Sequence, residues 1–285
     1  MTDHCIELVN VTKTYRNGSD AGNNEKIALN DITLTIHEGE YIGLIGMNGS
    51  GKSTLARLLN GLIKPTTGKV NVNGMDTRSP KHLMEIRRIV GMVFQNPDNQ
   101  IVCPVVEEEI AFGPENLGLA SDEIKRRIDW ALQIVGLEEL RDHAPHLLSG
   151  GQKQKLAIAS VLVMLPNYLI MDEPSSMLDP LGRQELLEHL RILNNQKGIA
   201  IIFISHNLED LIQADRLVVL DKGSIYLQGI PREVFADEAK LAAIGLEPPG
   251  LYRLINKLGK DGYDIDDHIK TVPELVEAIC HLSLR

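Results

Sequence analysis

The sequence predicts an α/β protein built around a mostly parallel β-sheet, and three observations carry this prediction. Short runs rich in Ile and Val alternate with longer stretches of helical period. Residues 41–45 (YIGLI) predict a strand, which leads into a glycine-rich loop at residues 46–54 (GMNGSGKST). Leucines at helical spacing then predict a helix over residues 52–62 that ends near Gly61. With 285 residues, 43% of them hydrophobic, the chain is long enough for one large domain and a smaller appendage.

The remaining elements are predicted from the same periodicities. Further strands are expected at residues 90–94, 168–171, 199–204 and 217–220. Residues 121–135 begin with the capping residue Ser121 and charged positions before an amphipathic run, so we expect them in a helical segment inserted between Phe94 and Tyr168. Residues 16–26, rich in Gly, Asn and Ser, predict a mobile surface loop between two strands. After about Gly229 the strand pattern stops, and the remainder indicates a small C-terminal appendage.

Composition excludes several classes of protein. A net charge of -10 without a long Lys/Arg run argues against a chain that coats nucleic acid or anionic lipid. The apolar stretches fall short of the ~20 residues that a membrane helix needs, and the N-terminus has no pattern of a secretion signal. We therefore expect a cytosolic chain. Cys5, Cys103 and Cys280 are odd in number and far apart, so they are interpreted as reduced structural thiols.

The glycine-rich loop predicts phosphate binding. Its glycines allow the loop to wrap with N–H groups pointing inward, above the N-terminus of a helix. Lys52 neutralises phosphate charge, and Ser53 can ligate Mg²⁺. A chance glycine-rich turn is the alternative, which the presence of both Lys and Ser disfavours. The predicted nucleotide-binding residues of the loop are Gly46, Asn48, Gly49, Ser50, Gly51, Lys52, Ser53 and Thr54.

Two downstream motifs fit the same chemistry. The apolar run at 168–171 ends in Asp172 and Glu173, which places one carboxylate for Mg²⁺ and a second for water activation; the alternative is an acidic helix cap. The string Ser149, Gly150, Gly151, Gln152 opens a helix predicted at residues 152–164 and forms a second anion-binding helix start, although such a turn is usually no more than a helix cap.

The order of these motifs resembles that of the ATPase subunits of ABC transporters, across most of residues 6–229. In that resemblance residues 46–54 correspond to Walker A, Gln95 to the Q-loop, residues 148–152 to the signature, Asp172 to Walker B, residues 176–179 to the D-loop and His206 to the switch histidine. It implies a P-loop NTPase core of RecA type with an antiparallel β region and a helical subdomain at about residues 96–165. The ATPase domain would span residues 1–229, and residues 230–285 would form a dimerisation appendage. It also implies head-to-tail pairing, so that the signature of one subunit faces the γ-phosphate held by the other.

Individual roles follow from that resemblance. Tyr15 would stack on adenine, unless it is an ordinary half-buried strand tyrosine. Gln95 would contact Mg²⁺ and the attacking water, or be a surface amide. His206 would contact the γ-phosphate and hold Glu173, or be a satisfied core histidine. Asp179 would couple two sites or cap the helix that starts at Pro180, or both. The implied catalytic residues are Lys52, Gln95, Glu173 and His206, and the implied Mg²⁺ ligands are Ser53, Gln95 and Asp172.

Three strings narrow the resemblance to energy-coupling factor (ECF) ATPases of vitamin and cobalt or nickel uptake. These are residues 94–102 (FQNPDNQIV), residues 107–114 (EEEIAFGP) and residues 176–180 (SMLDP), the last being common in the A1 type. Pro174 and Ser175 depart from the Ala-Thr more usual in that type. The resemblance implies ATP and Mg²⁺ as cofactors and a peripheral position on the cytoplasmic face of the cell membrane. Implied partners are a second ABC ATPase (a paired ECF ATPase or a second copy), a transmembrane coupling subunit and a substrate-binding membrane subunit, with no nucleic acid.

A docking hypothesis and two rival functions accompany this interpretation. Asp98 and residues 107–109 would offer carboxylates to arginines of the coupling subunit, unless they form only a solvated acidic face. The rivals are an ATPase of another ABC importer class and a soluble ABC ATPase that acts on ribosomes or DNA. Such soluble proteins usually carry two cassettes or a long coiled coil, whereas this sequence has a single Walker A motif and no sustained heptads.

Overall fold

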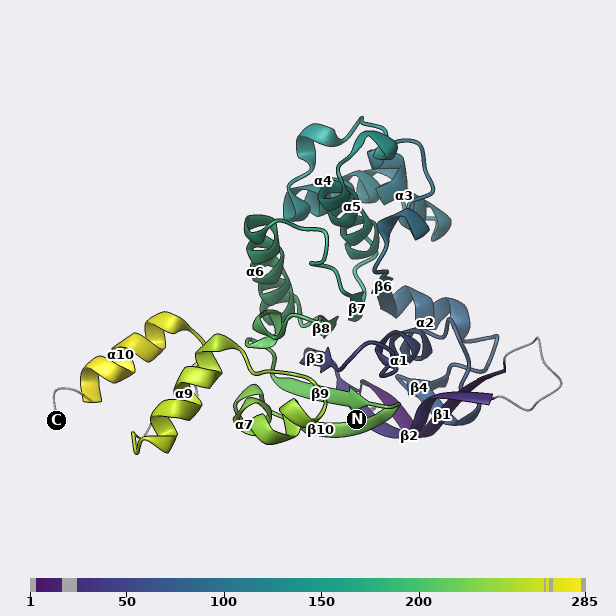
Figure 1. Ribbon diagram of the computed structural model, residues 1–285. Coiled ribbons are helices and arrows are strands. Elements are labelled where there is room, and N and C mark those ends of the chain that lie inside the picture. Colours follow the sequence, from purple (N-terminus) through teal and green to yellow (C-terminus); the bar gives the residue numbers. More distant parts are fainter. Residues whose placement is uncertain (1–3, 17–24, 264, 267–268, 283–285) are drawn as a thin grey trace.

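Two β-sheets organise the computed structural model, which describes residues 4–16, 25–263, 265–266 and 269–282 (Figure 1). The larger sheet has the order β10-β9-β3-β8-β7-β6, and all its neighbouring strands are parallel except β10 and β9. The smaller sheet, β2-β1-β4-β5, is antiparallel throughout. The strands are β1 Cys5–Arg16, β2 Glu25–His37, β3 Tyr41–Ile45, β4 Thr67–Val72, β5 Met75–Asp76, β6 Val90–Val93, β7 Tyr168–Asp172, β8 Ala200–Ile204, β9 Arg216–Asp221 and β10 Ser224–Gly229. The predicted α/β class with an antiparallel region is confirmed.

The central strands are buried on both faces, as expected for a parallel sheet covered by other layers. In β3, Ile42 and Leu44 join a core with α1 and the antiparallel sheet, whereas Tyr41 and Ile45 face a second core formed with the helices. The strands predicted at 41–45, 90–94, 168–171, 199–204 and 217–220 are all present, with ends shifted by one residue at most. Residues 17–24 of the predicted surface loop lie outside the described residues.

A block of helices occupies the sequence between β6 and β7 and lies together in the upper part of Figure 1. Helix α4 covers the predicted residues 121–135, but its N-cap is Ala120, so the expectation that Ser121 caps it is wrong. It ends at Gly136, whose φ of 64° suits a glycine C-cap. The α-helices of the chain are α1 Lys52–Leu59, α2 Leu83–Ile89, α3 Val106–Asn116, α4 Ser121–Val135, α5 Gly150–Leu162, α6 Pro180–Lys197, α7 Pro231–Ala236, α8 Glu238–Ala243, α9 Gly250–Lys260 and α10 Val272–Leu282.

Beyond Gly229 the described residues contain helices and no strand, as the sequence pattern predicts. The appendage has its own aromatic contact, with the rings of Phe235 and Tyr252 5.0 Å apart. Within the described residues no helix is long and apolar enough to cross a membrane. The three cysteines, all of them described, form no disulfide, which agrees with their interpretation as thiols.

Parallel pairing brings the carboxyl ends of β3, β6, β7 and β8 to one edge of the large sheet. Ligands of open α/β sheets bind at that edge. Every motif that follows one of these strands therefore opens toward the same space.

Candidate active site

The loop between β3 and α1 is shaped by glycines that other residues cannot replace. Gly46 has a φ of 151°, and a Cβ atom there would lie 2.3 Å from the Leu220 carbonyl oxygen. Gly51 is the left-handed N-cap of α1, with a φ of 109°, and a Cβ atom there would lie 2.7 Å from the Ala28 carbonyl oxygen. The loop is thus pressed between β9 and β2, and its backbone can approach a ligand closely.

Lys52 is held inside this loop. Its ammonium donates hydrogen bonds to the carbonyl oxygens of Gly46 at 2.7 Å and Met47 at 3.1 Å, and the residue is only 6% exposed. Burial lowers the pKa of Lys52, although the nearby carboxylates of Glu173 and Asp172 act in the opposite direction. A buried cation with only carbonyl partners suits a polyphosphate, whose charge would favour the protonated amine.

The end of β7 supplies oxygen ligands beside the loop. Asp172 is 5% exposed, and the Ser53 side chain lies close to it. Burial raises the pKa of Asp172, and the polar Ser53 side chain opposes this effect. A hydroxyl and a carboxylate are suitable oxygen donors for Mg²⁺. Among the described residues no group of three or more His, Cys, Asp or Glu side chains could hold a metal by itself, so nucleotide phosphates and water would have to supply further ligands.

Glu173 stands at the meeting point of three strand ends. Its side chain accepts a 2.6 Å hydrogen bond from Gln95 Nε2, after β6, and its other carboxylate oxygen contacts His206 Nε2, after β8. Its φ of 53° is unusual for a residue other than glycine, and the following Pro174 further restricts its backbone. Hydrogen bonds from its own N–H to the Ile204 oxygen at 3.0 Å and from the Ser176 hydroxyl to its oxygen at 2.9 Å hold this conformation.

These groups face one cleft of about 280 Å³. The predicted site residues that line it are Tyr15, Asn48, Gly49, Gly51, Lys52, Ser53, Thr54, Gln95, Glu173 and His206. Gly46, Ser50 and Asp172 belong to the same loop and strand end, and the Ser50 hydroxyl is buried without a hydrogen-bond partner among the described residues. Lys26 and Ala28 of β2 also line the cleft, and no motif in the sequence marks them because they are strand residues without a characteristic pattern.

The surroundings of His206, Gln95 and Tyr15 distinguish between the alternative roles of these residues. The His206 side chain is 43% exposed, so it is not a buried core histidine. Gln95 is exposed but paired with Glu173 rather than only solvated. Tyr15 is 39% exposed at the end of β1, and the Lys13 ammonium lies 5.2 Å from its ring centroid. The ring is therefore accessible to a planar ligand.

The second motif for which anion binding is predicted lies away from this cleft. Ser149 caps α5 in a complete capping box: its hydroxyl accepts from Gln152 N–H at 3.3 Å, and Gln152 Oε1 accepts from Ser149 N–H at 2.9 Å. Gly150 and Gly151 lie beside the turn at residues 176–179, because a Cβ atom at Gly151 would lie 3.2 Å from the Met177 oxygen. None of these four residues lines the Lys52 cleft.

The turn that precedes α6 is a helix cap. Asp179 Oδ1 accepts a 2.7 Å hydrogen bond from Gly182 N–H, and Pro180 takes the first helical position. The interpretation of Asp179 as a cap is confirmed, and its role in coupling two sites stays a prediction.

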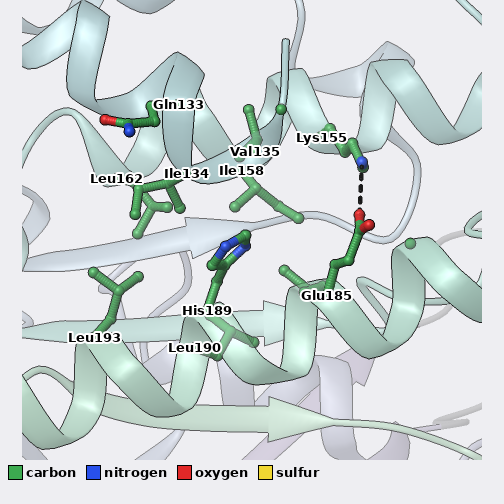
Figure 2. A pocket seen from close by; sticks show the side chains of 13 residues that line it. Gln133, Ile134, Val135, Lys155, Ile158, Leu162, Glu185, His189, Leu190 and Leu193 are labelled. Carbon is green, nitrogen blue, oxygen red and sulfur yellow. Dashed lines mark ion pairs between the residues drawn. The ribbon is translucent and has the colours of Figure 1, made fainter.

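Helices α5 and α6 face one another across a second cavity of about 220 Å³ (Figure 2). Ile134, Ile158 and Leu162 line one side, and Leu190 and Leu193 of α6 line the other. At one end Lys155 and Glu185 form an ion pair of 3.5 Å, which joins the helix that begins at Gly150 to α6. This apolar cavity is separate from the polar cleft at Lys52.

The proposed docking carboxylates have different environments, and one was assigned wrongly. Glu109 is 4% exposed and accepts hydrogen bonds from the N–H groups of Val102 and Cys103, both at 2.8 Å. It therefore stabilises the turn before α3 and cannot meet a partner. Glu107 pairs with Arg141 at 3.1 Å, and Asp98 pairs with Lys153 at 2.7 Å.

A phosphate-binding loop, a buried acidic strand end and a paired glutamate and histidine on this fold define a P-loop ATPase. The family model for ABC transporters matches residues 29–176. The energy-coupling factor transporter ATP-binding protein EcfA1 of Caldanaerobacter subterraneus is 48% identical over 96% of this chain and 98% of its own length. The solved structure of cbiO1 from Clostridium perfringens, part of the ABC transporter complex cbiONQ, is 38% identical with a TM-score of 0.73, covering 89% of this chain and 99% of that one.

A dimeric structure of the ATP-binding cassette MJ0796, in a post-hydrolysis state with ADP and Pi, is 30% identical with a TM-score of 0.73, covering 79% of this chain and 98% of that one. The chain belongs to the ABC transporter ATPases and, within them, to the energy-coupling factor ATP-binding proteins of the A1 type. It is an ATP-binding, ATP-hydrolysing protein. The departure at Pro174 and Ser175 does not alter this assignment.

Proposed function

We propose that the chain binds Mg²⁺ and ATP as the ATPase subunit of an ECF importer and powers uptake of a vitamin or a transition-metal ion through a membrane partner. The observation that supports this most is the contact of Glu173 with both Gln95 and His206, opposite Lys52 in one cleft. The near full-length similarity to EcfA1 proteins supports the assignment to importers. In this proposal the chain works at the cytoplasmic face of the cell membrane.

The residues of the cleft have separate roles in hydrolysis. Lys52 and the loop N–H groups bind the β- and γ-phosphates. Glu173 accepts the proton of a water whose oxygen attacks the γ-phosphorus as the bond to the β-phosphate oxygen breaks. Ser53, Asp172 and Gln95 would hold Mg²⁺, which when bound offsets phosphate charge. His206 donates to the γ-phosphate and orients Glu173, and Tyr15 stacks on the base.

The site is completed by a second ATPase subunit, either a paired ECF ATPase or another copy of this chain. Its Ser149, Gly150, Gly151 and Gln152 would approach the γ-phosphate from the open side of the cleft. The exposure of Ser149 and Gly150, and their absence from the cleft of their own chain, support this arrangement. The ATPase domain would comprise residues 1–229, with a helical subdomain at about 96–165, and the appendage at 230–285 would hold the pair together.

A transmembrane coupling subunit would dock beside the Q-loop. The Asp98 side chain is 63% exposed, so its carboxylate can exchange Lys153 for an arginine of the partner. Glu108, which is exposed, would be its neighbour in this contact. Asp98→Lys should reduce co-purification with the coupling subunit, and undiminished co-purification would remove Asp98 from the interface.

Mass spectrometry of the complex extracted from membranes with detergent tests the proposal as a whole. The expected complex contains two ABC ATPase subunits, a transmembrane coupling subunit and a separate membrane protein that binds the substrate. Recovery with an extracellular binding protein would favour another importer class. Recovery with ribosomes or DNA would favour a soluble ABC ATPase.

A further inference from the structure

Asp210 is a carboxylate buried behind the cleft. It lies in the 3-10 turn Leu208–Leu211, which follows His206, and is only 2% exposed. Burial of a carboxylate is costly unless hydrogen bonds and an opposite charge compensate. Its partners therefore indicate what the residue does.

Two serines from different loops donate to the same oxygen of Asp210. The hydroxyl of Ser205, the residue before His206, lies 2.9 Å from Oδ2, and the hydroxyl of Ser175, two residues after Glu173, lies 3.0 Å from it. The Ser205 oxygen also accepts a hydrogen bond from Asn207 N–H at 3.0 Å, so the residues directly before and after His206 are joined to each other. One carboxylate oxygen thus connects the loop of His206 to the turn of Glu173.

The other oxygen of Asp210 connects both loops to α6. Arg183 Nε donates to Oδ1 at 2.5 Å and neutralises the buried charge. Arg183 lies in the first turn of α6, four residues after the cap Asp179. The three partners therefore belong to the histidine loop, the glutamate turn and the helix that begins at the D-loop.

We propose that Asp210 is a positioning residue that sets His206 and Glu173 at contact distance from each other. The inference rests on the proposed roles of Glu173 and His206 in hydrolysis. Glu173 has a left-handed backbone, and such a conformation persists only where the surrounding structure over-determines it. The link from Ser175 to Asp210 is one such constraint, and the link from Ser205 places the histidine against the same turn.

The neighbouring residue offers a matched control. Glu209 is an exposed carboxylate in the same 3-10 turn, and it accepts from Gly250 N–H at 2.8 Å rather than from either catalytic loop. Glu209→Gln and Asp210→Asn make the same chemical change at adjacent positions. Only the second removes charge from the link between the two loops.

The test measures kcat, ATP affinity and thermal stability of the full chain in its assembled complex. Asp210→Asn is expected to lower kcat by about 10–100-fold, as removal of orienting residues around a reactive group does, and to leave ATP affinity unchanged. Glu209→Gln should match the unmodified protein. The double variant Ser175→Ala/Ser205→Ala keeps the ion pair with Arg183, so it should fold normally and still lose kcat. It carries the test if Asp210→Asn does not fold.

A variant that combines Asp210→Asn with the two serine substitutions distinguishes a positioning role of Asp210 from a general structural role. In the Asp210→Asn background, the two serine substitutions should cause little further loss of kcat, because both act through this carboxylate. Additive losses, or an ATP affinity that falls in parallel with kcat, would overturn the inference. So would an unchanged kcat in both variants. Hydrolysis by the unmodified complex and its loss in Glu173→Gln test the proposed function separately.

Discussion

The phosphate loop and the helix start at Ser149 are the two predicted anion-binding ends of this chain, yet they are built differently. The loop is enclosed by strand ends, and its buried Lys52 donates to the carbonyl oxygens of Gly46 and Met47. The helix start is exposed, and Ser149 and Gln152 already satisfy each other in a capping box. The first end is a preorganised cradle for a ligand of this chain. The second is stable by itself and exposed, as the proposal that it meets a ligand held by another subunit requires.

The largest effect is expected for Glu173 in the Lys52 cleft, where one substitution should abolish ATP hydrolysis without affecting ATP binding. Glu173→Gln should reduce kcat by about 10²–10⁴-fold, because the acceptor for the water proton is lost. ATP affinity should remain, because Lys52 and the loop N–H groups are unchanged. Turnover assays and equilibrium ATP binding on the same preparation measure the two quantities. Unaltered turnover in the assembled complex would contradict the assignment of Glu173.

The exposed helix start at Ser149 is tested by placing a negative charge at Gly150, where the fold has room for a side chain. In Gly150→Asp the new Cβ atom meets only the Met177 sulfur at 3.7 Å, and an acidic residue at a helix N-terminus is favourable. Stability and ATP binding by the single chain should be retained. In a pair made of two copies of this chain, turnover should fall about 10²-fold because the carboxylate repels the γ-phosphate in both paired sites. Gly150→Ala is the control for size, and equal losses in the two variants would point to sterics instead.

A smaller effect, on ATP affinity, is expected at Tyr15, which lines the Lys52 cleft. Tyr15→Ala should weaken ATP affinity by about 2–10-fold through loss of stacking, and Tyr15→Phe should preserve it. Titration with a fluorescent ATP analogue gives both values. Equal affinity of the alanine variant and the unmodified chain would show that the ring does not contact the base.

The smallest effect concerns the stability of the nucleotide-free protein. Because burial raises the pKa of Asp172 above its ordinary value of 3.8, the folded chain retains that proton to higher pH than the unfolded chain. Its ionised form therefore costs stability at pH 7, and this cost shrinks as the pH falls from the folded pKa toward the ordinary value of 3.8, below which both states hold the proton. Asp172→Asn should raise Tm at pH 7 by a few degrees, at roughly 2–4 °C per kcal/mol.

The measurement for Asp172→Asn is a series of melting curves from pH 7 to pH 4 in EDTA. The gain in Tm over the unmodified protein should shrink toward acid. A variant that melts below the unmodified protein at pH 7 would show that the favourable interactions of the Asp172 carboxylate with Ser53, Arg57 and Lys52 outweigh the burial of its charge.

Local periodicity predicted most of the fold. The strand at Tyr41–Ile45 and the helix at Ser121–Val135 have the predicted bounds, because their apolar patterns end at clear polar or glycine boundaries. Glu109 was misassigned because a run of three glutamates looks uniform in sequence. Glu109 differs from its two neighbours because it accepts hydrogen bonds from the N–H groups of Val102 and Cys103 and so stabilises that turn.

The resemblance implied the contact of His206 with Glu173, which the structure shows, but other contacts between motifs could not be predicted from the motifs themselves. The positions of Gln95 and Glu173 along the chain do not reveal that the same carboxylate also meets Gln95, because that depends on strand order in the sheet. Asp210 was missed for the same reason, since its partners Ser175 and Arg183 lie 35 and 27 residues away. An aspartate four residues after the histidine was the only local signal.

The most direct test of the central claim, that the enclosed cradle and the exposed helix start of different subunits form one site, uses two inactive variants. Lys52→Ala removes the cradle and keeps the helix start, and Gly150→Asp does the reverse. In a pair made of two copies of this chain, each variant should fail to turn over ATP alone, whereas an equimolar mixture should regain turnover because some pairs place an intact Lys52 opposite an intact Gly150. Full turnover by Gly150→Asp alone would contradict the claim, because the helix start would then be dispensable.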